Sequence, residues 1–516
     1  MQTEKEYIVG KEIAGLRCES VGEYSLPDYN GDVKKILLVK TRAYPQGKFV
    51  GDDTLEISGS VGYNVVYLDS ENNITHAEFS TDYDAALKIN SESYVDSDVN
   101  TAVSSYNVRL IGPRKFSVKS ILDTGVCMSE RKMHTIAGDA FMEYEPEYVG
   151  DGADVMSMAF GCSEARAYNE EITELGGAIA DEVEVLVCDA VAELEATDLS
   201  AGSVGLKGGI RVNMLYRNGN DTPVSVERVL PYSDEVMLEG ADEAQEVSAR
   251  LEILSLSSSV TPTEDGVKLS VSVSAIPRIL TRRNCRINLV EDAYLKERGV
   301  VNEYSDFNYT EHACTESAEE KYEVRQPLAE LELVDVREIL CPCASARVDG
   351  YEIHDNSLKI RGEIKFSGIA CQVSDDNEIV YAPVKFSAPF EQNVNITCQI
   401  HDNMRINCHV DALDTRVESD GSHLVATCML SASVSVSSDR RKRCLGASYI
   451  TDEEYSHDDS VVTVYYPDAS ENLFEIAKKF HTSVRAIAES NRLTEAVFAA
   501  SSSSLGSLGV TKLIVK

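Results

Sequence analysis

The sequence predicts a mainly β protein, with three tandem antiparallel, sandwich-like β modules followed by a small C-terminal α/β domain. Alternating apolar residues surround a glycine in three separate stretches, 55–69, 204–218 and 358–372. This is the period of a half-buried β-strand. The three stretches share their spacing to neighbouring residues, which indicates a repeat. Few stretches before residue 470 have helical period.

The repeat is defined by an aspartate and a glycine 27 residues apart, found at Asp32 and Gly59, Asp181 and Gly208, and Asp335 and Gly362. A glycine inside a strand usually marks a bulge, a bend or a close approach of another backbone. An aromatic–serine pair follows the glycine by 20, 24 and 24 residues, beginning at Phe79, Tyr232 and Phe386. We therefore expect one turn of the first copy to be shorter. A last marker begins at Asp139, Asp292 and Ala447.

These markers divide the chain into modules 1–150, 151–305 and 306–452 and a domain 461–516. Polar stretches at 69–73, 218–221 and 374–377 are typical of hairpin loops. Acidic connectors join the copies, and the pattern leaves open whether they are irregular or add a strand and a short helix to the next module. The acidic stretch 451–460 is a predicted hinge.

The charge balance argues against several partners. The 516 residues contain 48 basic and 86 acidic side chains, a net charge of −38. Such a field repels phosphate backbones and anionic lipids, so we expect no nucleic-acid partner. No apolar run is long enough to span a bilayer, which predicts no direct membrane insertion. The first residues lack the pattern of a signal peptide, which favours a cytoplasmic location.

The residues that carry catalysis or bind metals do not form a recognised pattern. Thirteen cysteines are spread without regular spacing, which favours free thiols in a reducing compartment. Cys341 and Cys343 have no second pair at zinc spacing. Cys408 and His409 would point to opposite faces of a strand. No P-loop, G-x-S-x-G or H-E-x-x-H motif occurs. We expect no enzyme activity, no metal and no cofactor.

Two basic clusters stand out in this acidic chain, Arg282-Arg283 and the run 440–443. One interpretation is a solvated strand end. The other is a contact for an acidic partner or for a neighbouring module.

The last part of the chain predicts the order strand, helix, helix, strand. Residues 461–465 alternate, and Leu473, Ile476, Ala477 and Phe480 fall on one helical face. Thr482 or Ser483 can cap a second helix. Residues 512–515 close as a strand.

The segment 461–493 resembles a LysM domain, in its opening strand, its two helices and the positions of Leu473, Ile487 and Asn491. Where that family has a Gly-Asp-Thr-Leu-Trp loop, this chain has 470–474, Ser-Glu-Asn-Leu-Phe. LysM domains hold N-acetylated glycans with this loop and the one after the second helix. The changed loop therefore does not favour peptidoglycan as the ligand.

The three copies resemble SPOCS modules, which begin with Leu-Pro-Asp and continue into an Ile-Leu strand, as Leu26-Pro27-Asp28 and Ile36-Leu37 do here. Three SPOCS-like modules followed by LysM are similar to the SipL family of spore coat morphogenetic proteins. The resemblance implies a non-enzymatic assembly scaffold in endospore formation, tethering coat basement-layer proteins to the forespore surface in the mother cell or to the spore coat. It implies a SpoIVA-like coat morphogenetic ATPase as partner, with other coat proteins as further candidates. The alternative is a glycan-binding protein of the wall or cortex.

The resemblance places the candidate partner-binding residues in the LysM-like domain: Asp468, Ser470, Glu471, Asn472, Leu473, Phe474, Ile487 and Asn491. Phe474 has two possible roles, an exposed anchor for the partner or a residue of the small domain's core.

Overall fold

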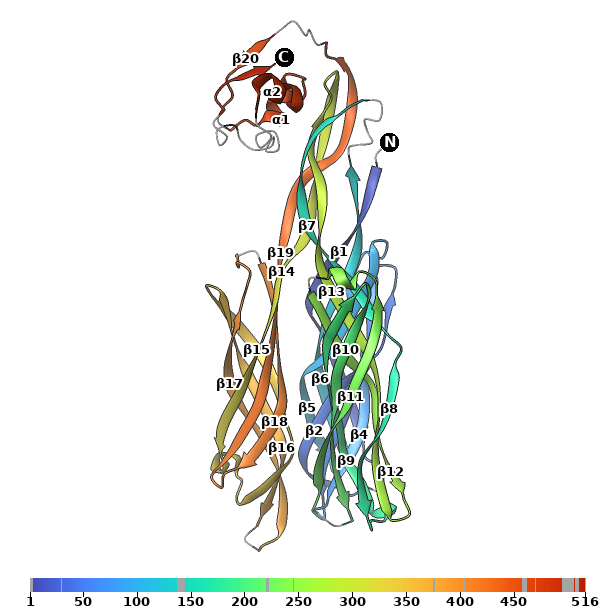
Figure 1. The fold of residues 1–516 in the computed structure, drawn as a ribbon. Coiled ribbons are helices and arrows are strands. Elements are labelled where there is room, and N and C mark those ends of the chain that lie inside the picture. The colour runs from blue at the N-terminus through green and yellow to red at the C-terminus, as the bar shows by residue number, and fades with distance from the viewer. Residues whose placement is uncertain are drawn as a thin grey trace.

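The computed structural model is elongated, with long β-strands side by side over most of its length and a small helical domain at one end (Figure 1). It describes residues 3–28, 30–136, 144–219, 222–244, 246–374, 376–401, 404–456, 462–468, 470–493, 505 and 510–515. The prediction of a mainly β protein is confirmed, because nearly all of the described elements are strands paired in antiparallel sheets.

The first unit consists of two three-stranded sheets, β2-β3-β4 and β1-β6-β5. Their facing side chains form one core in which Tyr67, Phe116 and Leu122 are fully buried. The strands are β1 (Thr3–Ser25), β2 (Val33–Val50), β3 (Thr54–Asp69), β4 (Ile74–Lys88), β5 (Tyr94–Gly112) and β6 (Lys115–Ile136).

The second unit has one sheet in the order β9-β10-β11 and one built on the long strand β13, with β12 on one side. On the other side of β13, β7 pairs with its second half and β8 with its first half. The strands are β7 (Glu147–Cys162), β8 (Arg166–Gly176), β9 (Val183–Ser200), β10 (Gly202–Asn218), β11 (Val224–Leu238), β12 (Glu246–Pro262) and β13 (Gly266–Tyr294). Two short 3-10 helices, η2 (Ala180–Glu182) and η3 (Ala241–Glu243), lie in its loops.

The third unit has the sheets β15-β16-β17 and β14-β19-β18 around a third core. Its elements are β14 (Arg298–Pro327), η4 (Leu328–Leu331), β15 (Val336–His354), β16 (Ser357–Val373), β17 (Ile379–Asn395), β18 (Met404–Ser419) and β19 (His423–Glu454). The connectors whose structure the sequence left open contain strands, β7 and the first part of β14. The predicted boundaries at 150 and 305 fall inside these two strands.

The three repeated glycines lie where another backbone or ring leaves no room for a side chain. A Cβ atom on Gly59 would overlap the Tyr83 hydroxyl, and one on Gly208 or Gly362 would overlap the carbonyl oxygen of the neighbouring strand. Close approach is therefore the reason for glycine at these positions.

The pairing of these strands corrects the alignment of the aromatic–serine pairs between the three copies. Gly59 pairs with Tyr83, and Gly208 pairs with Tyr232. Tyr232 therefore corresponds to Tyr83 rather than to Phe79, and the shorter turn predicted for the first copy is wrong. The third copy has the longer hairpin, since Gly362 pairs with Phe390. The aromatic marker was misaligned because an aromatic recurs four residues later on this strand.

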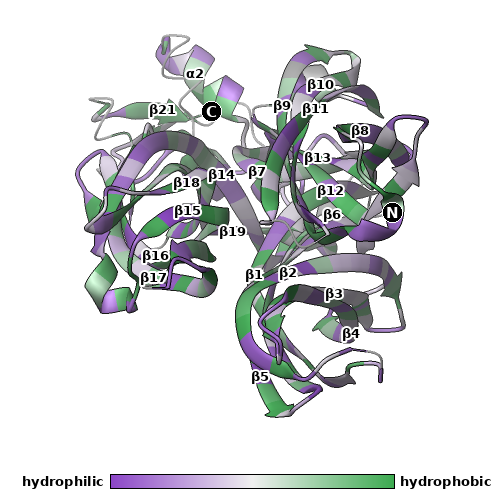
Figure 2. Ribbon diagram, turned by 90° about the horizontal axis from the view of Figure 1, so that it is seen from below, coloured by the Kyte–Doolittle hydropathy of each residue, from purple (hydrophilic) through white to green (hydrophobic). Residues whose placement is uncertain are grey.

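The three units meet around a shared apolar cluster, and in cross-section they form three lobes (Figure 2). Leu37, Leu186 and Leu340 lie in this cluster, each five residues after the repeat aspartate. The cluster also holds Val66, Leu215 and Ile369, each seven residues after the repeat glycine. Matching positions of the sequence repeat thus meet at the centre of the body.

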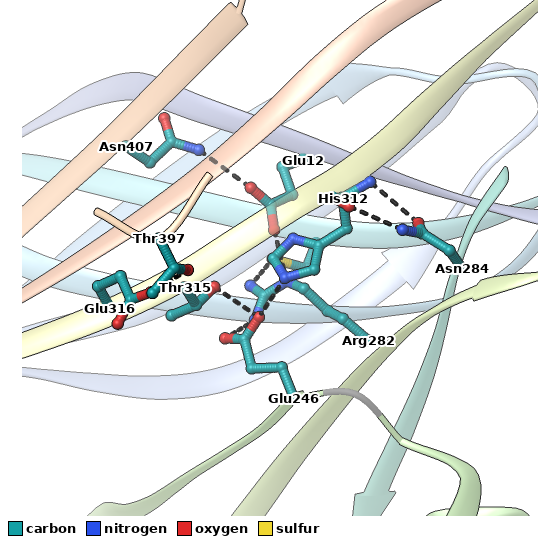
Figure 3. A network of polar contacts seen from close by, with 10 residues as sticks. Glu12, Glu246, Arg282, Asn284, His312, Thr315, Glu316, Thr397 and Asn407 are labelled. Carbon is teal, nitrogen blue, oxygen red and sulfur yellow. Dashed lines mark hydrogen bonds and ion pairs between the residues drawn. The ribbon is translucent and has the colours of Figure 1, made fainter. Parts of the chain in front are cut away.

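A second meeting point is ionic (Figure 3). Arg282 on β13 is buried, with its Nε 2.7 Å from Glu12 Oε1 on β1 and its Nη1 2.8 Å from Glu246 Oε1 on β12. Of the two interpretations of this basic cluster, contact with a neighbouring module applies to Arg282. The adjacent Arg283 is more exposed and pairs with Glu243.

The third unit completes this network. Asn407 Nδ2 on β18 donates to Glu12 Oε2 at 3.0 Å, and Thr315 Oγ1 on β14 donates to Glu246 Oε2 at 2.6 Å. His312 Nε2 lies 3.2 Å from the same carboxylate oxygen. Burial is the main reason that the pKa of His312 lies below its ordinary value; the Glu246 carboxylate opposes this shift and the Arg282 charge adds to it.

Beyond the network, β7, β13, β14 and β19 continue as a narrow stalk towards the C-terminal domain (Figure 1). The second basic cluster lies on this stalk and is paired within it. Lys442 Nζ is 2.9 Å from Asp151 and 3.2 Å from Glu291, and Arg440 Nε is 3.1 Å from Glu311.

The C-terminal domain has the predicted order strand, helix, helix, strand. Its elements are β20 (Thr463–Tyr465), α1 (Leu473–Lys479), α2 (Val484–Asn491) and β21 (Leu513–Val515). β20 pairs with β21, and both helices contribute to a small core. The predicted hinge lies partly outside the described residues, which resume at 462.

In the part of the chain that the structure describes, no disulfide joins any of the thirteen cysteines. Within the described parts of the chain, no helix is both long and apolar enough to cross a membrane.

Candidate partner-binding site

The three apolar residues among the predicted site residues lie in the core of the C-terminal domain. Leu473, Phe474 and Ile487 are 0%, 3% and 1% exposed. Phe474 is therefore buried in the full chain, and part of its cover comes from Tyr294, which lies outside the domain. The side chains fall inward because α1 and α2 each place one apolar face against the two-stranded sheet.

Two of the polar site residues hold the start of α1. Asn472 is its N-cap, since Asn472 Oδ1 accepts from Glu475 N at 2.8 Å while the Glu475 carboxylate accepts from Asn472 N at 3.2 Å. This reciprocal pair is a capping box. The Glu471 carboxylate accepts from the Tyr465 hydroxyl at 2.8 Å and from Asp468 N at 2.9 Å. Burial acts to raise the pKa of Glu471, but these donors and the Lys479 charge outweigh it and lower that pKa.

Asn491 ties α2 to β21. Its Nδ2 donates to the carbonyl oxygens of Ile487 at 2.8 Å and Ile514 at 2.7 Å, and its Oδ1 accepts from Ile514 N at 2.6 Å. Such a three-bond amide fixes the strand against the helix. Of the eight predicted residues, Asp468 and Ser470 are exposed, and both precede α1.

Among the described residues of this domain, the exposed large apolar side chains lie elsewhere, on β20 and its flanks. Val462, Val464 and Tyr466 are 53%, 48% and 69% exposed and alternate along the strand, so they share its outer face. Their partners in alternation, Thr463 and Tyr465, lie on the other face of the strand. The alternation at 461–465 was visible in the sequence, but it could not show which face the helices cover.

One face of α1 is covered by the tip of the stalk. The ring of Tyr294, the last residue of β13, meets the Phe474 ring edge-on, with centroids 5.2 Å apart. The Tyr294 hydroxyl donates to the Thr482 carbonyl oxygen at 2.6 Å, and Lys478 Nζ lies 2.6 Å from Asp292 Oδ2. Burial raises the pKa of Tyr294, and the nearby Glu147 carboxylate adds to this shift.

A second contact lies beside the first. The Tyr455 ring, just beyond β19, stacks on His481 with centroids 3.6 Å apart. Sequence reasoning singled out none of these stalk residues as site residues, although Asp292 and Tyr294 belong to the last repeat marker.

Comparison with known proteins finds one family. Residues 183–261 match the family model described as SipL, SPOCS domain. No match is found among curated proteins or among solved structures.

The SPOCS match covers β9, β10, β11 and nearly all of β12, four consecutive antiparallel strands of the second unit. It supports the SPOCS part of the predicted resemblance and relates the chain to sporulation. The matched segment ends before β13, so it does not include the stalk tip that contacts the C-terminal domain.

Among the residues that the structure describes, no group of three or more His, Cys, Asp or Glu side chains is arranged to hold a metal ion.

Proposed function

We propose that this protein is an assembly scaffold of endospore formation. Its β body is a rigid support, and its C-terminal domain binds a protein of the coat basement layer at the forespore surface, on the mother-cell side. The role is non-enzymatic and needs no cofactor. The observation that carries this proposal is the SPOCS match to residues 183–261.

The first and third units have the same strand arrangement as the matched segment. The matched strands β9 to β12 have counterparts in β2 to β5 and in β15 to β18, with the same antiparallel order of the first three strands. We therefore propose three SPOCS-type modules, corresponding to 1–150, 151–305 and 306–452. Their shared apolar cluster and the Arg282 network join them into one body, which suits a scaffold.

The C-terminal domain, 461–516, is proposed as the LysM-like part of the scaffold. Its order strand, helix, helix, strand supports this. The surface offered to a partner comprises Asp468 and Ser470 together with the β20 face that carries Val464 and Tyr466. Exposed aromatic side chains are frequent anchors of protein interfaces. The proposed partner is a SpoIVA-like coat morphogenetic ATPase, with other coat proteins as further candidates.

Glycan binding is the alternative, and the first loop of the domain favours a protein partner over it. The Glu471 carboxylate and the Asn472 amide are engaged within the domain. The Phe474 ring is covered by Tyr294 and cannot stack on a sugar in this arrangement.

The test compares binding of the full chain to a purified coat ATPase with binding to insoluble peptidoglycan. We expect binding to the ATPase, and Tyr466→Ala should weaken it by about 2 kcal/mol, roughly 30-fold. Tyr449→Ala, at a 52% exposed tyrosine on the stalk, is the matched control and should leave the affinity unchanged. Binding to peptidoglycan with none to the ATPase would replace this proposal by the glycan alternative.

A further inference from the structure

We propose that the surface formed by Phe474 and Lys478 on α1 and by Thr482 in the turn after it binds an extended segment carrying Asp-x-Tyr, and that the chain's own Asp292-Ala293-Tyr294 occupies it. The inference rests on the proposed function and deepens it, since it names what a partner of this domain would present.

The two sides of the contact match in spacing. Asp292 and Tyr294 are two residues apart on a strand, so their side chains share one face. Phe474 and Lys478 are four residues apart on α1, which also places them on one face. The aromatic pair and the ion pair can therefore form together, and both are present.

Asp292 is oriented for this contact. Its Oδ1 accepts from Asn302 Nδ2 at 2.7 Å, from Ala293 N at 2.9 Å and from the Tyr304 hydroxyl at 3.0 Å. These donors fix the carboxylate, and Oδ2 faces Lys478. A fixed carboxylate loses less conformational entropy on pairing than a free one.

Tyr294 supplies both an apolar and a polar contact. It is 4% exposed, with its ring against Phe474 and its hydroxyl on the Thr482 carbonyl oxygen. A buried tyrosine needs a partner for its hydroxyl, and the turn between the helices provides one. Phenylalanine at this place would leave that carbonyl oxygen without its donor. The site therefore selects tyrosine.

The third copy of the repeat has a tyrosine at the position of Tyr294 but no aspartate two residues before it. In the third copy the marker reads Ala447-Ser448-Tyr449, so alanine stands where the second copy has Asp292. Tyr449 is 52% exposed and, among the described residues, is not part of the core that Tyr294 shares with the C-terminal domain. The corresponding residues of the first copy, from Asp139, lie outside the described residues.

The partner that fits is a protein segment in extended conformation with an aspartate two residues before a tyrosine. Its side chains supply the recognition, because the backbone of β13 here is already paired with β7. Such a partner competes with the chain's own strand, so the native chain should bind it weakly until the stalk tip is displaced.

The experiment uses a labelled peptide of residues 289–297 (Leu-Val-Glu-Asp-Ala-Tyr-Leu-Lys-Glu) and the full chain in four forms. Tyr294→Ala and Asp292→Asn each remove one of the contacts that hold the chain's own segment in the site, which makes that segment easier to displace, and Tyr449→Ala is the control. We expect fluorescence anisotropy to show that the Tyr294→Ala and Asp292→Asn variants bind the peptide at least about tenfold more tightly than the native chain and the control do. Peptides with asparagine for aspartate or alanine for tyrosine should lose at least about tenfold in affinity.

Hydrogen exchange of residues 473–491 shows whether the domain stays folded in each variant. If Tyr294→Ala unfolds it, Asp292→Asn decides, because that variant keeps the aromatic contact. No peptide binding by Tyr294→Ala or Asp292→Asn with the domain folded would overturn the inference, as would equal binding by the native chain. Unfolding of the domain in both variants would also overturn it, because the contact would then be core rather than a separable site. Peptide binding without binding of any coat protein would leave the inference standing and remove the proposed function.

Discussion

Replacing Arg282 by methionine should destabilise the protein strongly, because it leaves two carboxylates unpaired in the interior. The side chains of Arg282, Glu12 and Glu246 are 9%, 10% and 15% exposed. Removing one member of a buried ionic group costs about 3–5 kcal/mol, since the remaining charges lose their counter-charge but not their desolvation penalty. Arg283→Met is the matched control, because its ion pair with Glu243 is exposed and such pairs contribute about 0–1 kcal/mol.

The difference is large enough to measure by thermal melting. For a unit of this size, 1 kcal/mol shifts the melting temperature by about 2–4 °C. Arg282→Met should therefore lower the melting temperature by about 6–20 °C, and Arg283→Met by at most about 4 °C. Neutralising the two carboxylates as well, with Glu12→Gln and Glu246→Gln added to Arg282→Met, should recover most of the loss.

Equal small shifts for the two single arginine variants would refute this reasoning. So would a triple variant as unstable as Arg282→Met, because the penalty would then come from lost packing rather than from unpaired charge.

Three further predictions concern pH, the repeat glycines and the C-terminal domain. The pKa of His312 is lower in the folded protein than in the unfolded chain, so the unfolded chain takes up the proton at a higher pH. The free energy of unfolding that neutral His312 contributes should be fully present above the unfolded pKa of about 6.5 and be lost as the pH falls through the folded value. A melting temperature no more pH-dependent between 7.5 and 5 in the native chain than in His312→Gln would contradict it. Gly362→Ala should lower the free energy of unfolding, measured in denaturant melts, by about 1–3 kcal/mol, because the added Cβ overlaps the neighbouring strand. Gly350→Ala has open space around it and should be nearly neutral. Equal losses of stability in the two variants would refute the role of close approach. Asn491→Ala should reduce the hydrogen-exchange protection of β21 by about 1–3 kcal/mol, because the strand loses its bonds to the amide. Arg485→Ala removes an exposed helical ion pair and should leave this protection unchanged. Unchanged protection in both variants would show that the Asn491 amide does not fix the strand.

The sequence alone determined the local features of this protein. Alternation around Gly59, Gly208 and Gly362 predicted strands, and the structure has β3, β10 and β16 there. The helical spacing of four apolar residues predicted the first helix of the C-terminal domain, and a cap at Thr482 or Ser483 predicted the second; the structure has Ser483 as that cap. These predictions succeed because strand and helix periods are set by the backbone and show in the nearest neighbours along the chain.

The tertiary structure decided which of these local features meet. Glu12 and Arg282 are 270 residues apart, and nothing in either local pattern pairs them. The same holds for Phe474, whose burial the sequence left open and which β13 covers through Tyr294. An apolar or charged pattern indicates that a side chain needs a partner. Which partner it finds depends on how the sheets pack, and that arrangement is stabilised by many contacts between residues distant in sequence.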